Sequence, residues 1–122
     1  MSKCQTIVVR RDFDVIVARS RVRDLARSMG LGTSDQARIS LATSSVARAL
    51  NLGESCPGEI VIESVNGQEH ACVRVTCTCR ASDGADDGLR SSKLADARSM
   101  ADEMIIEELP ASGVQVVLVK WR

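Results

Sequence analysis

The order of apolar periodicities along this chain constrains its fold more than any other feature. Apolar residues alternate, as in strands, near the start, in the middle and at the end, and between these they recur every three to four residues, as in helices. The order is strand, helix, helix, hairpin, helix, hairpin. It predicts a two-layer α/β sandwich in which a mixed or antiparallel sheet of about five strands carries three helices on one face. Without strict strand–helix–strand alternation, a doubly wound nucleotide-binding fold is not expected.

Local signals place the boundaries of these segments. Asp12 and Asp14 are N-cap candidates for the first helix, and Thr33 with Gln36 has the spacing of a capping box for the second. The pair Asn66-Gly67 is a strong hairpin signal. The predicted segments are strands at 6–10, 59–65, 70–79, 104–109 and 114–121, helices at 12–29, 34–50 and about 94–104, and a polar loop at 81–93.

Composition suits one compact domain over residues 1–122, because 44% of the residues are hydrophobic and 26% are charged. No apolar run is long enough to span a membrane and the start lacks signal-peptide character, so we expect a cytoplasmic protein with no membrane partner. The formal net charge of zero gives no indication of nucleic acid binding.

The five cysteines are odd in number and lack paired two-residue spacing, so neither a disulfide framework nor a structural metal is expected. Alternation instead predicts that Cys77 and Cys79 point into the core as small apolar residues. His70, the only histidine, follows a turn, where an exposed or hydrogen-bonded role is favoured over catalysis or metal binding.

Charge is unevenly distributed. Arginines dominate residues 10–27, whereas acidic residues dominate 83–108. Arg19, Arg23 and Arg27 recur every four residues, so their guanidinium groups lie on one side of the first helix. This arrangement is either a solvated helix face or a docking surface for a charged protein partner.

The stretch "ATSSVARAL", residues 42–50, places Thr43, Ser44 and Ser45 in succession inside the second predicted helix. Hydroxyl side chains compete with the helical backbone for hydrogen bonds and are more common at caps. Periodicity alone indicates small residues packed where the sheet comes close.

The stretches "TSDQARI" and "SVAR" and the closing tryptophan strand resemble the anti-sigma-factor and serine-protein switch-kinase branch of the GHKL ATPase superfamily, which includes gyrase, histidine kinases and MutL. The resemblance runs through nearly the whole chain in element order, and implies the histidine-kinase-like ATPase fold. In that family the second helix carries a glutamate that orients or deprotonates the attacking group. Four residues later an asparagine holds the Mg²⁺ of the nucleotide.

Aligned on "SVAR", the glutamate position holds Ser45 and the asparagine position holds Ala49. An unaided serine is no general base, and a methyl group cannot bind Mg²⁺. The resemblance places the adenine at Asp83 or Asp86, a remnant at best, and the alternatives there are a solvated turn or a poorly matching calcium loop. The glycine-rich lid over the phosphates is shortened to "LRSSK", in which Lys93 is a lone cation.

The resemblance therefore implies a non-catalytic regulator in bacterial transcriptional signalling, stress or developmental, that binds a sigma factor, an STAS-domain protein or a phosphatase regulator. It implies docking at Arg19, Arg23 and Arg27, with no cofactor and no metal. The alternative is a divergent serine-protein kinase that uses ATP and Mg²⁺ to phosphorylate an STAS-domain anti-anti-sigma protein. An assembly module is a third hypothesis, and a homodimer is left open.

Overall fold

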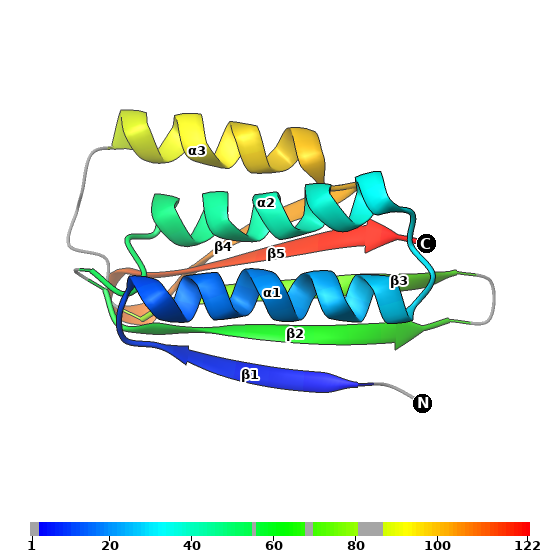
Figure 1. Cartoon of the computed structure of the whole chain (residues 1–122). Helices are drawn as coiled ribbons and strands as arrows, with labels where there is room; N and C mark the ends of the chain where they lie inside the picture. The colour runs from blue at the N-terminus through cyan, green and yellow to red at the C-terminus, as the bar shows by residue number, and fades with distance from the viewer. Residues whose placement is uncertain (1–2, 55, 68–69, 81–86) are drawn as a thin grey trace.

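The fold is taken from a computed structural model that describes residues 3–54, 56–67, 70–80 and 87–122. A five-stranded sheet forms one layer and three helices form the other (Figure 1). A single 3-10 turn, η1 (Pro110–Ser112), joins the last two strands. The strands are β1 (Cys4–Val9), β2 (Gly58–Asn66), β3 (Ala71–Cys79), β4 (Glu103–Leu109) and β5 (Gly113–Trp121), and the helices are α1 (Asp12–Ser28), α2 (Thr33–Ala49) and α3 (Asp87–Met100).

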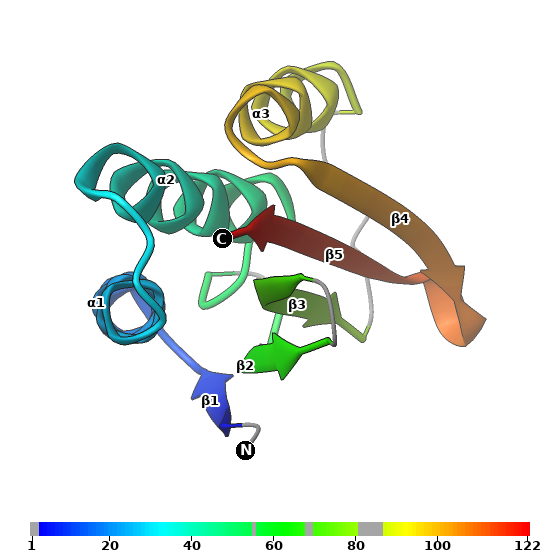
Figure 2. The ribbon, with the colours of Figure 1, turned by 90° about the vertical axis from the view of Figure 1, so that its right-hand side faces the viewer.

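The strand order is β1-β2-β3-β5-β4, and every neighbouring pair is antiparallel. Of the two sheet types predicted, the antiparallel one is therefore correct. All three helices lie over the same face, and none of the described helices lies against the opposite face (Figure 2). The predicted two-layer α/β sandwich is confirmed.

The core lies between the two layers and is built from one side of every strand. On β3 the inward positions alternate along the strand, so Val73, Val75 and Cys77 are fully buried and Cys79 is 1% exposed. On α1 and α2 the buried side chains recur at helical spacing. The predicted inward orientation of Cys77 and Cys79 is confirmed, and burial raises the pKa of the Cys77 thiol to about 12.

Both helix starts differ from the predicted caps. The N-cap of α1 is Arg11, and Asp14 lies in the first turn, where its Oδ2 accepts hydrogen bonds from the backbone N–H groups of Arg10 (2.8 Å) and Arg11 (3.3 Å). The N-cap of α2 is Gly32, not Thr33. Gln36 Nε2 donates to the Leu31 carbonyl at 2.9 Å, so the predicted capping box is wrong although the helix is present.

Two further boundaries differ. The segment 87–93, predicted as loop, is the start of α3, and the helix ends at Met100, with Met104 lying in β4. The β4 pairing explains the second difference, because Met104 faces Leu118 across the ladder with β5. Strand pairing at a distance therefore overrides the helical spacing that continues locally through Met104.

A buried lysine ties three elements together at one end of the sandwich. Lys120, in β5 and 8% exposed, places its Nζ 3.1 Å from Asp102 Oδ1 and 3.5 Å from Asp35 Oδ1. Asp102 lies between α3 and β4, and its Oδ2 accepts the backbone N–H of Trp121 at 2.7 Å. These bonds join α2, the α3–β4 connection and the end of β5.

Candidate functional site

Two of the three consecutive hydroxyls of α2, those of Thr43 and Ser44, donate to carbonyl groups of the same helix. Thr43 is fully buried and its Oγ1 donates to the Ile39 carbonyl at 2.8 Å, and Ser44 Oγ donates to the Leu41 carbonyl at 3.0 Å. Such bonds satisfy buried hydroxyls without any group from outside the helix. The small side chains thus let α2 lie between α1 and α3, which flank it (Figure 2).

Ser45 and Ala49 lie one helical turn apart on α2, at the positions that the resemblance assigns to the catalytic glutamate and the metal-binding asparagine. Ala49 is 4% exposed and belongs to the hydrophobic core, whereas Ser45 is half-buried. A buried methyl group has no lone pair for a cation. The residues present at these two positions therefore do not fit Mg²⁺.

The other nucleotide motifs are only partly visible. Asp83 and Asp86, the adenine candidates, lie outside the described residues. The connection from β3 to α3 is residues 80–86, because the helix already begins at Asp87. Lys93 is thus a half-buried helical residue rather than part of a loop.

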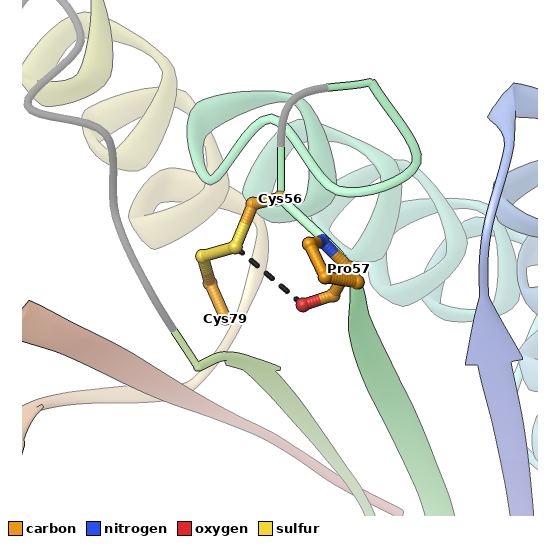
Figure 3. The surroundings of a disulfide bond; sticks show 3 residues. All are labelled: Cys56, Pro57 and Cys79. Atoms are coloured by element: carbon orange, nitrogen blue, oxygen red, sulfur yellow. Dashed lines mark hydrogen bonds between the residues drawn. A yellow bond between two sulfur atoms is a disulfide. The ribbon is translucent and has the colours of Figure 1, made fainter. Parts of the chain in front are cut away.

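A disulfide joins Cys56 to Cys79 (Figure 3), and the two Cα atoms are 6.1 Å apart. It links the loop after α2 to the last residue of β3. The expectation that the cysteines carry no disulfide is therefore wrong. Because β2 pairs Gly58 with Cys79, Cys56 approaches Cys79 through a register that spacing along the chain does not reveal.

The predicted arginine surface lies on α1, outside the core. Arg23 and Arg27 are exposed and Arg19 is half-exposed. Arg27 Nη2 donates to Asp24 Oδ1 at 2.7 Å, within the same helix. The charge of Arg27 is thus partly balanced locally, and Arg19 and Arg23 have no ion pair with any residue that the structure describes.

A cavity of about 370 Å³ lies beside Arg19, between the start of α1 and the end of α2. Arg48 of α2 and Lys93 of α3 add two cations to its lining, and Asp12 and Glu54 add two carboxylates. Ser44 lines the cavity but Ser45 and Ala49 do not, because they project from another side of α2. The lining of the cavity therefore does not include the two positions that the resemblance assigns to catalysis and metal binding.

The sequence patterns do not single out Arg48 and Ile16, which line the cavity, or Phe13, which is exposed on α1. Arg48 lies inside the motif "SVAR", and the resemblance carried by that motif assigns no role to its basic side chain. Phe13 and Ile16 are 62% and 58% exposed on α1. The sequence signal for Phe13 and Ile16 is their position outside the buried stripe of α1, because large apolar side chains on the outward side of a helix indicate an interaction surface.

Two other kinds of site can be addressed in the described residues. No three His, Cys, Asp or Glu side chains of residues 3–54, 56–67, 70–80 and 87–122 gather closely enough to hold a metal ion. Among the helices described, none combines the length and the apolar character that crossing a bilayer requires.

His70 is exposed and the centre of its ring lies 5.8 Å from that of Trp121, in an edge-to-face arrangement.

Comparison with known proteins gives three informative matches, although no protein-family model matches the chain. The chain is 26% identical to the serine/threonine-protein kinase RsbT of Bacillus subtilis (strain 168), over 99% of this chain and 98% of RsbT. The structure of the RsbU and RsbW domains of Rv1364c from Mycobacterium tuberculosis matches with a TM-score of 0.69 at 19% identity, over 98% of this chain and 33% of that one. The SiaB-SiaC complex from Pseudomonas aeruginosa matches with a TM-score of 0.52 at 10% identity, over 97% and 89%.

The match to RsbT spans nearly the full length of both chains, and the two solved structures share the fold. The chain is therefore a homologue of RsbT, and its resemblance to the anti-sigma-factor and switch-kinase branch of the GHKL superfamily is confirmed.

Proposed function

We propose that this protein is a non-catalytic regulator that acts by binding another protein in bacterial transcriptional signalling, stress or developmental. The observation that carries the proposal is the pair Ser45 and Ala49 on α2, with Ala49 closed into the core at 4% exposure. Loss of one acid–base or electrostatic element typically costs about 10²-fold or more in rate. Two such losses on one helix leave a scaffold suited to binding rather than phosphoryl transfer.

The partner surface that we propose is the outward side of α1, with Arg19 and Arg23 as its uncompensated cations and Arg27 at its far end. Complementary charge steers protein association and fixes its register. The partner classes are a sigma factor, an STAS-domain protein or a phosphatase regulator. Support for a protein partner comes from solved structures of this fold, one of a SiaB-SiaC complex and one holding RsbU and RsbW domains in a single chain.

The same proposal places the protein in the cytoplasm, with neither nucleic acid nor membrane as its partner. A stable disulfide is more typical of oxidising compartments. Because the Cys56–Cys79 disulfide bears on the compartment, the cytoplasmic location is a prediction that cell fractionation tests. A homodimer is tested separately by light scattering across a range of protein concentrations.

The partner is identified by co-purification with the tagged chain from a native extract, followed by titration with the purified partner. We expect Arg19→Glu with Arg23→Glu to weaken binding at least tenfold. The matched control is Arg98→Glu, an exposed arginine on α3, which should leave binding unchanged. Retention of no sigma factor, STAS-domain protein or phosphatase regulator, or equal binding by both variants, would contradict the proposal.

A second candidate function is an ATP-dependent serine-protein kinase that phosphorylates an STAS-domain anti-anti-sigma protein. The observation that favours it is the match to RsbT, whose name is that of a serine/threonine-protein kinase. In this candidate Asp83 or Asp86 would contact adenine. Calorimetric titration with Mg-ATP separates the two candidates, because binding in the micromolar range would support the kinase and overturn the non-catalytic proposal.

A further inference from the structure

A groove of about 690 Å³ is lined by outward-facing residues of the sheet, and its lining includes neither residues of α1 nor Ser45 and Ala49. None of the described helices lies against this face of the sheet (Figure 2). The groove is open to solvent and crosses four strands at one end of the sheet. Its lining combines apolar, aromatic and charged side chains: Val65, Gly67, His70, Cys72, Arg74, Glu103, Val119 and Trp121.

The floor of the groove is apolar. Strand register places Cys72 between Val65 of β2 and Trp121 of β5, on the outward face of the sheet. Cys72 is 5% exposed and Val119, beside it in the next row, is 8% exposed. Because Cys72 and Val119 are buried although no described helix covers this face, the larger side chains around them shield them from solvent. These larger side chains form the walls of the groove.

The principal wall is aromatic. Trp121 remains 40% exposed, and the His70 ring lies against it at 5.8 Å with an interplanar angle of 66°. The indole thus has surface available to a ligand and is held by a neighbouring ring. Tryptophan is the aromatic side chain that attracts cations most strongly over its face.

The charges around the groove are unbalanced in the acidic direction. Arg74 Nε donates to Glu63 Oε1 at 2.9 Å across the β2–β3 ladder, and this hydrogen bond raises the pKa of Arg74. Glu103, on the other side of Val119 in the same row, has no hydrogen bond or ion pair with any residue that the structure describes. Once Arg74 and Glu63 neutralise each other, the carboxylate of Glu103 is the net charge of the groove.

Burial raises the pKa of the Cys72 thiol. The positive charge of Arg74 opposes this effect, and the carboxylates of Glu103 and Glu63 add to it. Both carboxylates therefore lie near enough to the floor to act on a group bound there.

We propose that this groove binds a basic, partly apolar peptide segment, in which an arginine or lysine side chain lies along Val119 and Trp121 and pairs with Glu103. The aliphatic stem of such a side chain matches the apolar floor, and its charged end matches the aromatic wall and the unpaired carboxylate. The groove is larger than one side chain requires, which favours a peptide with apolar neighbours over a small amine.

Trp121 is the only tryptophan of the chain, so its fluorescence reports on the groove without a label. The whole chain is titrated with the peptide acetyl-Leu-Arg-Leu-amide, with acetyl-Leu-Gln-Leu-amide and with agmatine. We expect a saturable change in tryptophan emission with the arginine peptide, and at least tenfold weaker responses with the other two ligands. Raising the salt concentration should weaken the arginine-peptide response.

The deciding variant is Glu103→Gln, which removes the charge at an exposed position and keeps the shape. It should weaken the arginine peptide at least tenfold, whereas the matched control Glu107→Gln, two positions along the same face of β4, should bind as the unaltered chain does. The proposal is overturned by an arginine peptide that gives no saturable response, by Glu103→Gln binding normally, or by agmatine binding as tightly as the peptide. Since Arg19 and Arg23 are absent from the groove, none of these outcomes affects the proposed function.

Discussion

At the scale of single residues, the side chain at position 49 is a methyl group buried in the hydrophobic core. Ala49 is 4% exposed and packs in the hydrophobic cluster between α2 and the sheet. We expect Ala49→Asn to lower the free energy of unfolding by about 1–3 kcal/mol, because the larger amide overpacks the site and buries polar atoms without partners. Urea denaturation followed by circular dichroism measures this difference.

The control at the same scale is Ser45→Gln, one turn earlier on α2. Ser45 is half-buried, so a longer polar side chain can reach solvent, and the expected change is within about 1 kcal/mol. An Ala49→Asn variant as stable as the unaltered chain would show that space for the family's asparagine has been kept.

At the scale of elements, the disulfide fastens the loop after α2 to the end of β3. Its two cysteines are 23 residues apart in sequence. We expect Cys79→Ser to lower the free energy of unfolding of the oxidised protein by about 2–4 kcal/mol, because the unfolded chain regains the freedom of a closed loop. Urea denaturation with and without dithiothreitol gives the measurement.

The exposed Cys4 provides the comparison, since Cys4→Ser removes a thiol and no cross-link. Its unfolding midpoint should match that of the unaltered chain in both redox conditions. If dithiothreitol changed the free energy of unfolding of Cys79→Ser and of the unaltered chain by the same amount, the disulfide would not be stabilising the fold.

Gly58 starts β2 at a point of close approach. A Cβ there would meet the carbonyl oxygen of Thr78 and Cδ2 of Leu52, so β2 and the loop before it could not both keep their positions. We expect Gly58→Ala to lower the melting temperature, at a cost of about 1–3 kcal/mol. Gly32→Ala is the control, because an added Cβ at Gly32 has nothing within 4 Å, and weaker N-capping should cost less than about 1 kcal/mol.

At the scale of the whole molecule, the bonds around Lys120 make stability depend on acidity. Burial opposes ionisation of Asp102, but the hydrogen bonds from the Trp121 backbone and from Lys120 outweigh it, so the pKa of Asp102 is lowered. A carboxyl group with a lowered pKa stabilises the fold above its ordinary pKa of 3.8, and this contribution is lost as the pH falls through the folded value.

We therefore expect Asp102→Asn to be less stable than the unaltered chain at pH 7, because Lys120 stays buried with only Asp35 nearby. The difference should be about 1 kcal/mol, because the Asp102 side chain is 35% exposed and solvent screens its charge. The difference should narrow as the pH falls below 3.8, where the unaltered chain also loses the charge. Melting temperatures at a series of pH values test this, and a constant difference at all pH values would contradict it.

The fold could be predicted because its signals are local. Alternation along 70–79 and the stripe of α1 each arise from side chains facing one core, so element order and the orientation of Cys77 follow from spacing. That Ser45 and Ala49 stand where the resemblance expects a glutamate and an asparagine follows equally from the sequence, because residue identity is a local property.

What was missed depends on residues that are distant along the chain. Cys56 meets Cys79 through the β2–β3 register, and Arg48 joins Arg19 only once α2 packs beside α1. Glu103 and Trp121 share a groove because β4 and β3 both pair with β5.

The sequence by itself determined the element types and the layer arrangement, and it put Ser45 and Ala49 at the two positions that the resemblance assigns to a catalytic glutamate and a metal-binding asparagine. Each of these follows from residue type and local period. The tertiary structure alone decided that Ala49 is sealed in the core, that two cysteines are cross-linked, and that the outward sheet face holds a groove lined by Trp121, Arg74 and Glu103. The physical reason is that burial, register and unpaired charge are relations between segments. No single segment carries them.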